Sequence, residues 1–311
     1  MGWSERDLPD LDGRVVVVTG ASAGLGLEST RALAAAGAHV VLATRDAAKT
    51  EAAAARVRRA VPGARLERLE LDLADLANVA HAADVLAERH PKVDVLLANA
   101  GLMATPSRRT VDGFELQLGV NHLGHAAFVA ATLPLVEAAD AGRVVVVSSM
   151  MHVVGRLRRH DLMFDRGYDR WAAYGQSKLA NLLYVRELQR RLTAAGARTV
   201  AVAAHPGYAA TELQTKGPTM QGGLSAAVNA AATRTLNLLV ARPAAAGAGP
   251  QLYAATAPDV RPAGFYGPRI AGAYGSPGPS WSTPRARDDD DARWLFERTE
   301  QLTGVGHDLP G

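Results

Sequence analysis

The chain lacks cysteine and long apolar stretches, and each absence excludes a class of protein. With no cysteine among its 311 residues, it can form no disulfide bond and carry out no thiol redox chemistry. No apolar run approaches the roughly 18 residues of a membrane-spanning helix, so no membrane span is expected. Residues 1–7 do not have the pattern of a signal peptide. We therefore expect a cytoplasmic protein.

Aromatic residues and clustered basic charge are also scarce. Aromatic residues make up 5% of the chain, and the net charge of +3 comes from arginines interleaved with acidic residues. No stripe of basic and aromatic residues marks a nucleic-acid interface, so we expect no nucleic-acid partner. The four aspartates at 288–291 suit the start of a C-terminal helix, because negative charge there complements the helix dipole.

Four histidines are candidates for a metal site, but their pattern does not favour one. They are His122, His125, His152 and His205. Their spacings match no tight metal site, and the chain has no cysteine to complete one. We expect these side chains to be packed or hydrogen-bonded, and no metal to be bound.

Strand and helix patterns alternate along the chain. Segments rich in Val and Leu recur near residues 15, 40, 67, 94, 145 and 200, with helical stretches between them and no linker. This alternation predicts a single-domain α/β fold, a doubly wound Rossmann-type sheet that is mainly parallel, with about seven strands and helices on both faces. Residues 198–204 are the expected sixth strand and 264–266 a seventh. The Gly/Pro-rich stretch 264–284 is expected to be a loop packed on the body.

The first such unit carries a glycine-rich turn. A β-branched run at 15–18 predicts a buried strand, a helical segment follows at 27–36, and residues 40–43 predict the next strand. In this βαβ context the turn predicts nucleotide binding, and the alternative is a tight turn without a ligand.

The glycines of this turn have separate functions. Gly20 allows the tight turn, Gly24 lets the backbone approach a pyrophosphate, and Gly26 allows close packing of helix on strand. The helix that begins near Gly24 directs free N–H groups toward the phosphates.

The end of the second strand bears on the choice between NADP and NAD. Thr44 occupies the position where an acidic residue would hold a ribose 2′-hydroxyl, and Arg45 follows it. Arg45 can pair with a 2′-phosphate, Lys49 could assist, and Asp46 is expected to cap the next helix. We therefore favour NADP, the alternative being that Arg45 is a solvated surface charge.

Tyr174 and Lys178 are four residues apart, which places both on one face of a helix. An ammonium beside a phenol favours the phenolate and lowers the tyrosine pKa. The pair can therefore make a proton donor that works near neutral pH. Such a pair also occurs on ordinary amphipathic helices.

Together these motifs resemble the short-chain dehydrogenase/reductase family over roughly residues 12–270. The coenzyme turn matches Thr19, Gly20, Gly24 and Gly26, and the later Asn-Ala-Gly turn matches Asn99, Ala100 and Gly101, with Ala98 where a second Asn is usual. The resemblance is strongest to the retinol dehydrogenase and protochlorophyllide reductase-like group, whose members commonly prefer NADP. It implies the catalytic set Asn121, Ser149, Tyr174 and Lys178. It implies a cofactor site formed by Gly20, Ser22, Ala23, Gly24, Leu25, Gly26, Arg45, Asp72, Leu73, Asn99, Ala100, Gly101, Tyr174, Lys178, Pro206, Gly207 and Thr211.

The resemblance implies hydride transfer between nicotinamide and a carbonyl or alcohol of a small molecule. Tyr174 would be the general acid or base, Lys178 would lower its pKa and bind the ribose, Ser149 would position the substrate oxygen, and Asn121 would anchor a relay water. Two alternatives stay open: a C=C reductase on the same frame, and a nucleotide-binding regulator without turnover.

The resemblance also implies a strand order of 3-2-1-4-5-6-7 and places specificity in two segments. These are a substrate loop at about 150–170 and a lid at about 208–245, followed by a C-terminal extension at about 264–311. The Ala/Gly-rich, Leu-containing lid predicts a lipophilic substrate. Family members often pair through the helices that bear Asn121 and Tyr174, so a homodimer or homotetramer is open, unless the tail covers that surface.

Overall fold

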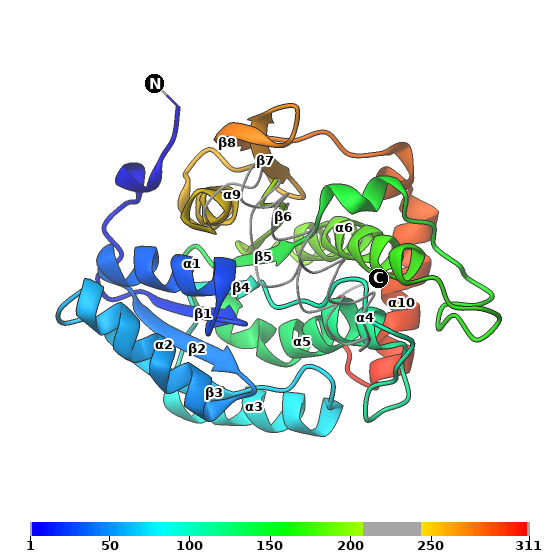
Figure 1. Ribbon diagram of the computed structural model, residues 1–311, viewed down its shortest axis with the longest axis horizontal. Helices are drawn as coiled ribbons and strands as arrows, with labels where there is room; N and C mark the ends of the chain where they lie inside the picture. Colours follow the sequence, from blue (N-terminus) through cyan, green and yellow to red (C-terminus); the bar gives the residue numbers. More distant parts are fainter. Residues whose placement is uncertain (1, 208–243, 310–311) are drawn as a thin grey trace, which may run out of the picture.

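One eight-stranded sheet organises the computed structural model, which describes residues 2–207 and 244–309 (Figure 1). The strand order is β3-β2-β1-β4-β5-β6-β7-β8, parallel except for the antiparallel pair β7–β8. The strands are β1 (Val15–Thr19), β2 (His39–Thr44), β3 (Arg65–Glu70), β4 (Val95–Ala98), β5 (Arg143–Val147), β6 (Val200–Ala204), β7 (Phe265–Ile270) and β8 (Tyr274–Pro279).

Helices cover both faces of this sheet, which is why the central strands are apolar on both sides. The longer helices are α1 (Gly24–Ala35), α2 (Ala47–Ala60), α3 (Leu76–Arg89), α5 (Gly124–Glu137), α6 (Arg170–Ala194), α9 (Ala244–Thr256) and α10 (Asp289–Thr303). The short ones are η1 (Glu5–Asp7), α4 (Leu116–Leu118), the π-helix η2 (Gly119–Leu123), η3 (Met150–Val153) and η4 (Pro284–Arg287). Val16 and Val18 of β1 pack toward α1, α2 and α9, whereas Val17 packs toward α3, α5 and α6.

The predicted fold class and strand order are confirmed, but the tail from 264 to 284 is not a loop. It forms β7 and β8, so the sheet has one strand more than the seven expected. β8 is an edge strand, and an edge tolerates Pro277 and Pro279 because one side of the strand needs no ladder hydrogen bonds. The register also shifts between Pro268 and Ile270.

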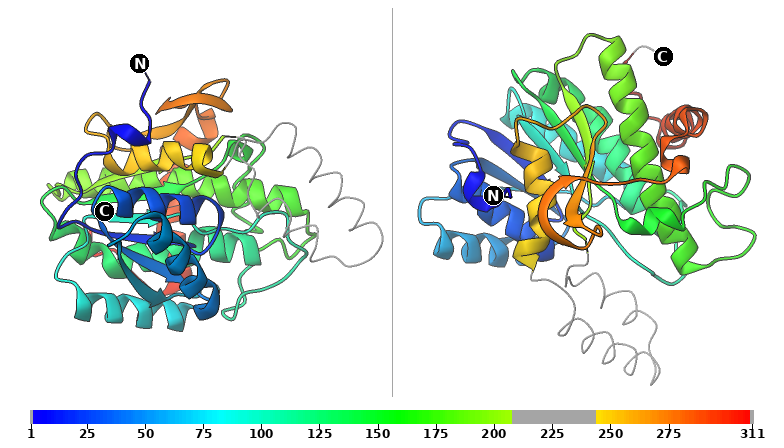
Figure 2. Two further views of the ribbon diagram at one scale, coloured as in Figure 1. Left: turned by 60° about the vertical axis from the view of Figure 1, so that its left-hand side comes forward. Right: turned by 90° about the horizontal axis from the view of Figure 1, so that it is seen from above.

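The C-terminal helix α10 lies outside α6, against the face of α6 that points away from the sheet (Figures 1 and 2). Its start is as predicted, since the Asp288 side chain accepts a hydrogen bond from the Asp291 N–H at 2.9 Å. Asp46 caps α2 in the same way, through the Lys49 N–H. Among the described residues, no helix is both long and apolar enough to cross a membrane.

Candidate active site

Many of the predicted site residues come from the carboxyl ends of β1, β4, β5 and β6, which lie side by side in the sheet. This edge of a parallel sheet is where ligands bind in doubly wound folds. Thr19 ends β1, Asn99 follows β4, Ser149 follows β5 and Pro206 follows β6. The topology therefore collects residues that are almost 190 positions apart in the chain.

The glycine turn has the shape of a phosphate cradle. Gly20 has a φ of +67°, in the left-handed region, and a Cβ on Gly26 would come within 2.7 Å of the Asn99 side-chain amide. α1 begins at Gly24 after Ala23, which offers no side-chain cap. The first-turn N–H groups therefore point to the cradle without a capping side chain, as a pyrophosphate site requires.

Thr19 ties the cradle to the active site through His125. The Thr19 hydroxyl accepts the N–H groups of Asn99 and Ala100, both at 2.9 Å, and lies 2.8 Å from His125 Nε2. Its only proton therefore goes to Nε2, which makes His125 a neutral imidazole that donates from Nδ1 to the Asn121 carbonyl at 3.3 Å. Burial, aided by the Lys178 charge, lowers the pKa of His125 to about 3, in keeping with the neutral form.

Arg45 and Asp72 are neighbours at the ends of β2 and β3, as the predicted cofactor site requires. Arg45 Nη1 lies 3.6 Å from Asp72 Oδ2, and the Arg45 side chain is 72% exposed. A guanidinium has five N–H donors, so this loose contact, the one that Arg45 makes within the described part of the chain, leaves the guanidinium able to pair with a phosphate.

The catalytic candidates converge between α6 and the end of β5. Lys178 Nζ lies 5.8 Å from the centre of the Tyr174 ring and donates to the Val147 carbonyl at 3.0 Å. Both side chains are buried, and Ser149 is close enough to the Tyr174 phenol to act on its pKa. A Cβ on Gly101 would lie 3.6 Å from Lys178 Nζ, so the turn after β4 passes beside the lysine.

Burial is the main cause of the pKa shifts of Tyr174 and Lys178. It raises the pKa of Tyr174 to about 12, and only Ser149 works the other way. Burial also lowers the pKa of Lys178 to about 8. In the protein alone the tyrosine pKa thus moves away from neutrality, opposite to the direction expected from Lys178.

The Asn121 side chain is engaged with protein groups on both of its ends. Its Oδ1 accepts the Leu102 N–H at 2.7 Å, and its Nδ2 donates to the Leu102 carbonyl and the Ser177 hydroxyl, each at 2.9 Å. Both amide protons are therefore used to fix the turn after β4 against α6. The relay water expected here remains a prediction.

The Pro-Gly turn after β6 is held by the β7–β8 hairpin. Gly207 has a φ of +69°, and its N–H donates to His205 Nδ1 at 3.2 Å. His205 Nε2 in turn lies 2.8 Å from the hydroxyl of Ser280, just after β8. The predicted residue Thr211, like most of the predicted lid, lies outside the described residues.

The four flagged histidines are buried and hydrogen-bonded, as expected. His122 pairs with Thr299 on α10, and His152 Nε2 accepts the Thr283 N–H at 3.3 Å. Together with His205 they attach the C-terminal segment to the body.

Two groups of residues near the site were not predicted. Gln251 of α9 donates to the Ser29 hydroxyl at 2.7 Å and to Asn99 Oδ1 at 3.1 Å, bracing the coenzyme turn from behind. The Tyr168 hydroxyl accepts from Gln117 at 2.8 Å and donates to the Thr105 carbonyl at 3.0 Å, which anchors the end of the 150–170 segment. No local sequence pattern predicts these hydrogen bonds, because each joins residues more than 50 positions apart.

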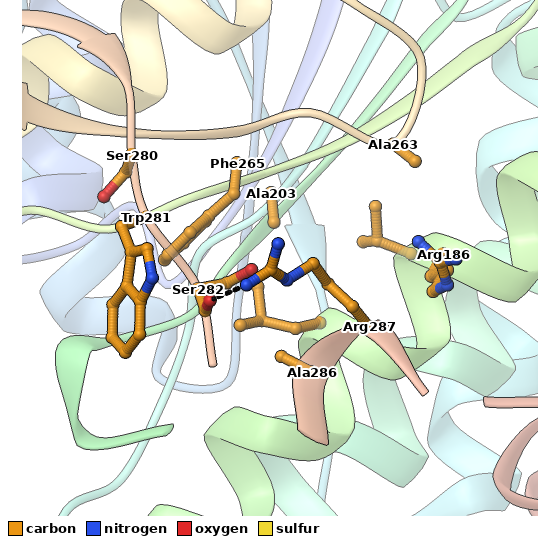
Figure 3. A pocket seen from close by; sticks show the side chains of 11 residues that line it. Arg186, Ala203, Ala263, Phe265, Ser280, Trp281, Ser282, Ala286 and Arg287 are labelled. Atoms are coloured by element: carbon orange, nitrogen blue, oxygen red, sulfur yellow. Dashed lines mark hydrogen bonds between the residues drawn. The ribbon is translucent and has the colours of Figure 1, made fainter. Parts of the chain in front are cut away.

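A cavity of about 370 Å³ lies farther along α6, under the segment that follows β8 (Figure 3). Its described lining includes Leu182, Phe265, Trp281 and Arg287, but not Ser149, Tyr174 or Lys178. It begins two helical turns beyond Tyr174, and none of the candidate catalytic residues lines it.

Comparisons with known proteins give a consistent picture. A family model described as short chain dehydrogenase matches residues 14–222. Human retinol dehydrogenase 12 is 36% identical over 95% of this chain and 88% of its own length, and mouse retinol dehydrogenase 14 is 33% identical over 95% and 87%.

Solved structures agree with the sequence matches. A crystal structure of an uncharacterised protein from Mycobacterium paratuberculosis is 42% identical, with a TM-score of 0.82 over 99% of this chain and 100% of that one. A short-chain dehydrogenase from Escherichia coli CFT073, solved in complex with NADPH, is 25% identical, with a TM-score of 0.61 over 79% of this chain and 92% of that one.

Proposed function

The chain belongs to the short-chain dehydrogenase family, in its retinol dehydrogenase-like group, and we propose that it is an NADP(H)-dependent oxidoreductase of a lipophilic alcohol or carbonyl compound. The observation that carries this proposal is the convergence of Ser149, Tyr174 and Lys178 beside the glycine cradle. The nicotinamide, when bound, supplies the hydride chemistry.

Tyr174 is the proton donor in reduction and the acceptor in oxidation. Its raised pKa keeps the phenol protonated at neutral pH, which suits the donation of a proton to a carbonyl oxygen. Ser149 lies near the phenol, so an oxygen bound between the two hydroxyls would accept from both and have its developing charge stabilised.

Lys178 orders this arrangement and supplies positive charge. A pKa of about 8 leaves the ammonium mostly protonated at pH 7. One of its protons is donated to the Val147 carbonyl, and no other described residue accepts a hydrogen bond from it, so its remaining protons could bind a ribose hydroxyl beside Gly101. The ammonium would favour the phenolate that forms when Tyr174 donates its proton.

The choice of NADP is supported by Arg45, whose exposed guanidinium follows β2 and can pair with a 2′-phosphate. It is also supported by Thr44, because an acidic residue at that position would repel a 2′-phosphate. The bound NADPH of the E. coli relative supports the same choice. The lipophilic substrate is supported by the names of the retinol dehydrogenases to which the chain is similar.

The function is tested by following NADPH consumption with a panel of long-chain aldehydes, ketones and enones, and NADP⁺ reduction with the matching alcohols. We expect turnover with lipophilic aldehydes or ketones and their alcohols. Turnover of enones alone would replace this proposal with the C=C reductase alternative. NADPH binding with no turnover across the panel would instead support the non-catalytic regulator.

A further inference from the structure

Two imidazole nitrogens and one carboxylate oxygen meet at the amino-terminal end of β2, remote from the coenzyme cradle. His39 is the first residue of β2, Glu67 lies in β3, and His90 follows the last turn of α3. His39 Nε2 lies 3.4 Å and His90 Nε2 lies 2.9 Å from the same oxygen, Glu67 Oε2. The three ligand atoms all lie within 4.8 Å of one another.

The fold, rather than chance rotamers, brings these side chains together. His39 pairs in register with Arg65, so Glu67, two residues farther along β3, points to the same face of the sheet. α3 packs on that face through Leu86, and His90 is one turn beyond it. Three different elements therefore direct one donor atom each to a single point.

We propose that His39, Glu67 and His90 form a binding site for a divalent transition-metal ion of the Zn²⁺ class. Zn²⁺ takes imidazole nitrogens and carboxylate oxygens at about 2.0–2.2 Å, so ligand atoms in a tetrahedron are about 3.3 Å apart. The separations of 2.9 and 3.4 Å from Glu67 approach this value, and the two histidine nitrogens, within 4.8 Å of each other, would move together around an ion. A fourth position opens to solvent, because His39 is 33% exposed and Glu67 21%.

The surrounding charges suit ligation by these groups. His39 is partly buried and His90 is buried, and both imidazoles lie against the carboxylate of Glu67. Arg89 Nη1 donates to Glu67 Oε1 at 2.9 Å, which orients the carboxylate and leaves Oε2 to face the histidines.

Two arginines near the site limit which cation it can hold. Arg89 contacts Glu67 directly. Arg65, which pairs in register with His39, places a second positive charge nearby, although the Arg65 guanidinium bonds Asp12 and the Gly37 carbonyl. One carboxylate does not offset this charge for Mg²⁺ or Ca²⁺, which require several oxygen ligands. Imidazole ligation makes Zn²⁺ and Ni²⁺ the ions expected to bind.

The competing explanation is that Glu67 and His90 form only a hydrogen bond that fastens α3 to β3. Titration of the untagged, metal-free full-length chain with ZnCl₂ against a chelating indicator separates the two. We expect one tight equivalent of Zn²⁺ in the wild type and a rise in the thermal midpoint with added Zn²⁺ but not Mg²⁺. His39→Gln and His90→Gln should each weaken this binding at least about tenfold and remove the thermal shift.

His81→Gln is the matched control, because His81 is an exposed histidine on the same helix α3 and should leave the binding unchanged. His39→Gln removes the more exposed ligand, so it remains informative even where His90→Gln disturbs packing. A wild type that binds no stoichiometric Zn²⁺ would overturn the proposal. Binding that His39→Gln and His90→Gln both retain at full strength would do the same.

Discussion

At the scale of single residues, the buried Lys178 destabilises the folded protein, and its proposed part in catalysis explains why a lysine stands there. Burying the ammonium lowers its pKa from 10.5 to about 8, which corresponds to a destabilisation of about 3 kcal/mol while the group is charged in both states. Asn181 Nδ2 also donates to the Val147 carbonyl, at 3.1 Å, so that acceptor stays paired without the lysine.

We therefore expect Lys178→Met to abolish turnover but raise the free energy of unfolding at pH 7, by up to about 3 kcal/mol. The gain should shrink as pH rises above about 8, where the folded form loses its proton, and vanish near 10.5, where the unfolded form does. Urea unfolding at pH 7 and 9.5 measures both values. Lys49→Met, at a 72% exposed side chain, should change stability by less than about 0.5 kcal/mol. A Lys178→Met variant less stable than wild type at pH 7 would show that the burial cost is wrongly assigned.

Arg45 is the residue expected to decide between the two coenzymes. Arg45→Ala removes a charge-assisted, potentially bidentate pair with the 2′-phosphate, so we expect NADPH binding to weaken about 10- to 100-fold. NADH binding should hardly change, because NADH carries no 2′-phosphate. Fluorescence titrations with both coenzymes measure this, and equal weakening of the two would assign Arg45 a structural role only.

The residues that the sequence could predict are those with local motifs. The Gly20–Gly26 turn and the Tyr174–Lys178 pair are set by spacing along a few residues. Their supporting contacts are not: Gln251 reaches Asn99 from 152 positions away and His125 reaches Thr19 from 106. The direction of the Tyr174 pKa was missed for the same reason, because the sequence shows the neighbouring charge but not the burial.

At the scale of elements, α10 is attached to α6 by an aromatic stack. Phe296 is fully buried and stacks on Tyr184 with ring centres 5.5 Å apart, and the Arg191 guanidinium lies 4.4 Å from the centre of the Phe296 ring. His307 continues this contact by bonding the Tyr184 hydroxyl at 2.7 Å.

Phe296→Ala should lower the free energy of unfolding by about 3–5 kcal/mol, because it leaves a cavity that the helix pair cannot close. Glu297→Ala, one residue along α10 at a half-exposed side chain, is the control and should cost less than about 0.5 kcal/mol. Chemical denaturation gives both values. A loss below about 1 kcal/mol for Phe296→Ala would mean that α10 contributes little to the fold.

Elements were predictable where periodicity was strong, as in β1, α1 and β2. The start of β7 was expected at 264–266, but the rest of β7 and all of β8 were missed, because their Gly and Pro content is typical of a loop. What makes this segment a strand pair is the partner edge of β6, which pairs with Phe265 and Tyr266, and this partner lies about 60 residues away.

At the scale of the whole molecule, three described surfaces are poorly suited to pairing two copies. α10 packs on α6 and α5, the helices through which relatives often associate. β8 closes one edge of the sheet with a strand that contains Pro277 and Pro279, and β3 ends the other edge with alternating charges.

We therefore expect a monomer of 32.6 kDa in solution. Size-exclusion chromatography with light scattering, over a wide range of protein concentration, measures the mass directly. A stable dimer would show that copies pair through a surface other than these three, or that α10 moves from its position on α6.

The proposed function depends on Tyr174 as the proton donor for hydride transfer. The direct measurement is kcat/KM for NADPH-dependent reduction of the best carbonyl substrate by wild type and Tyr174→Phe, with the dissociation constant for NADPH determined in parallel. Tyr253→Phe removes the same atom from α9, where the hydroxyl bonds Asp259, and serves as the control. We predict a loss of about 10²–10⁴-fold in kcat/KM for Tyr174→Phe with NADPH binding intact, and little change for Tyr253→Phe. Wild-type activity in Tyr174→Phe would contradict the account.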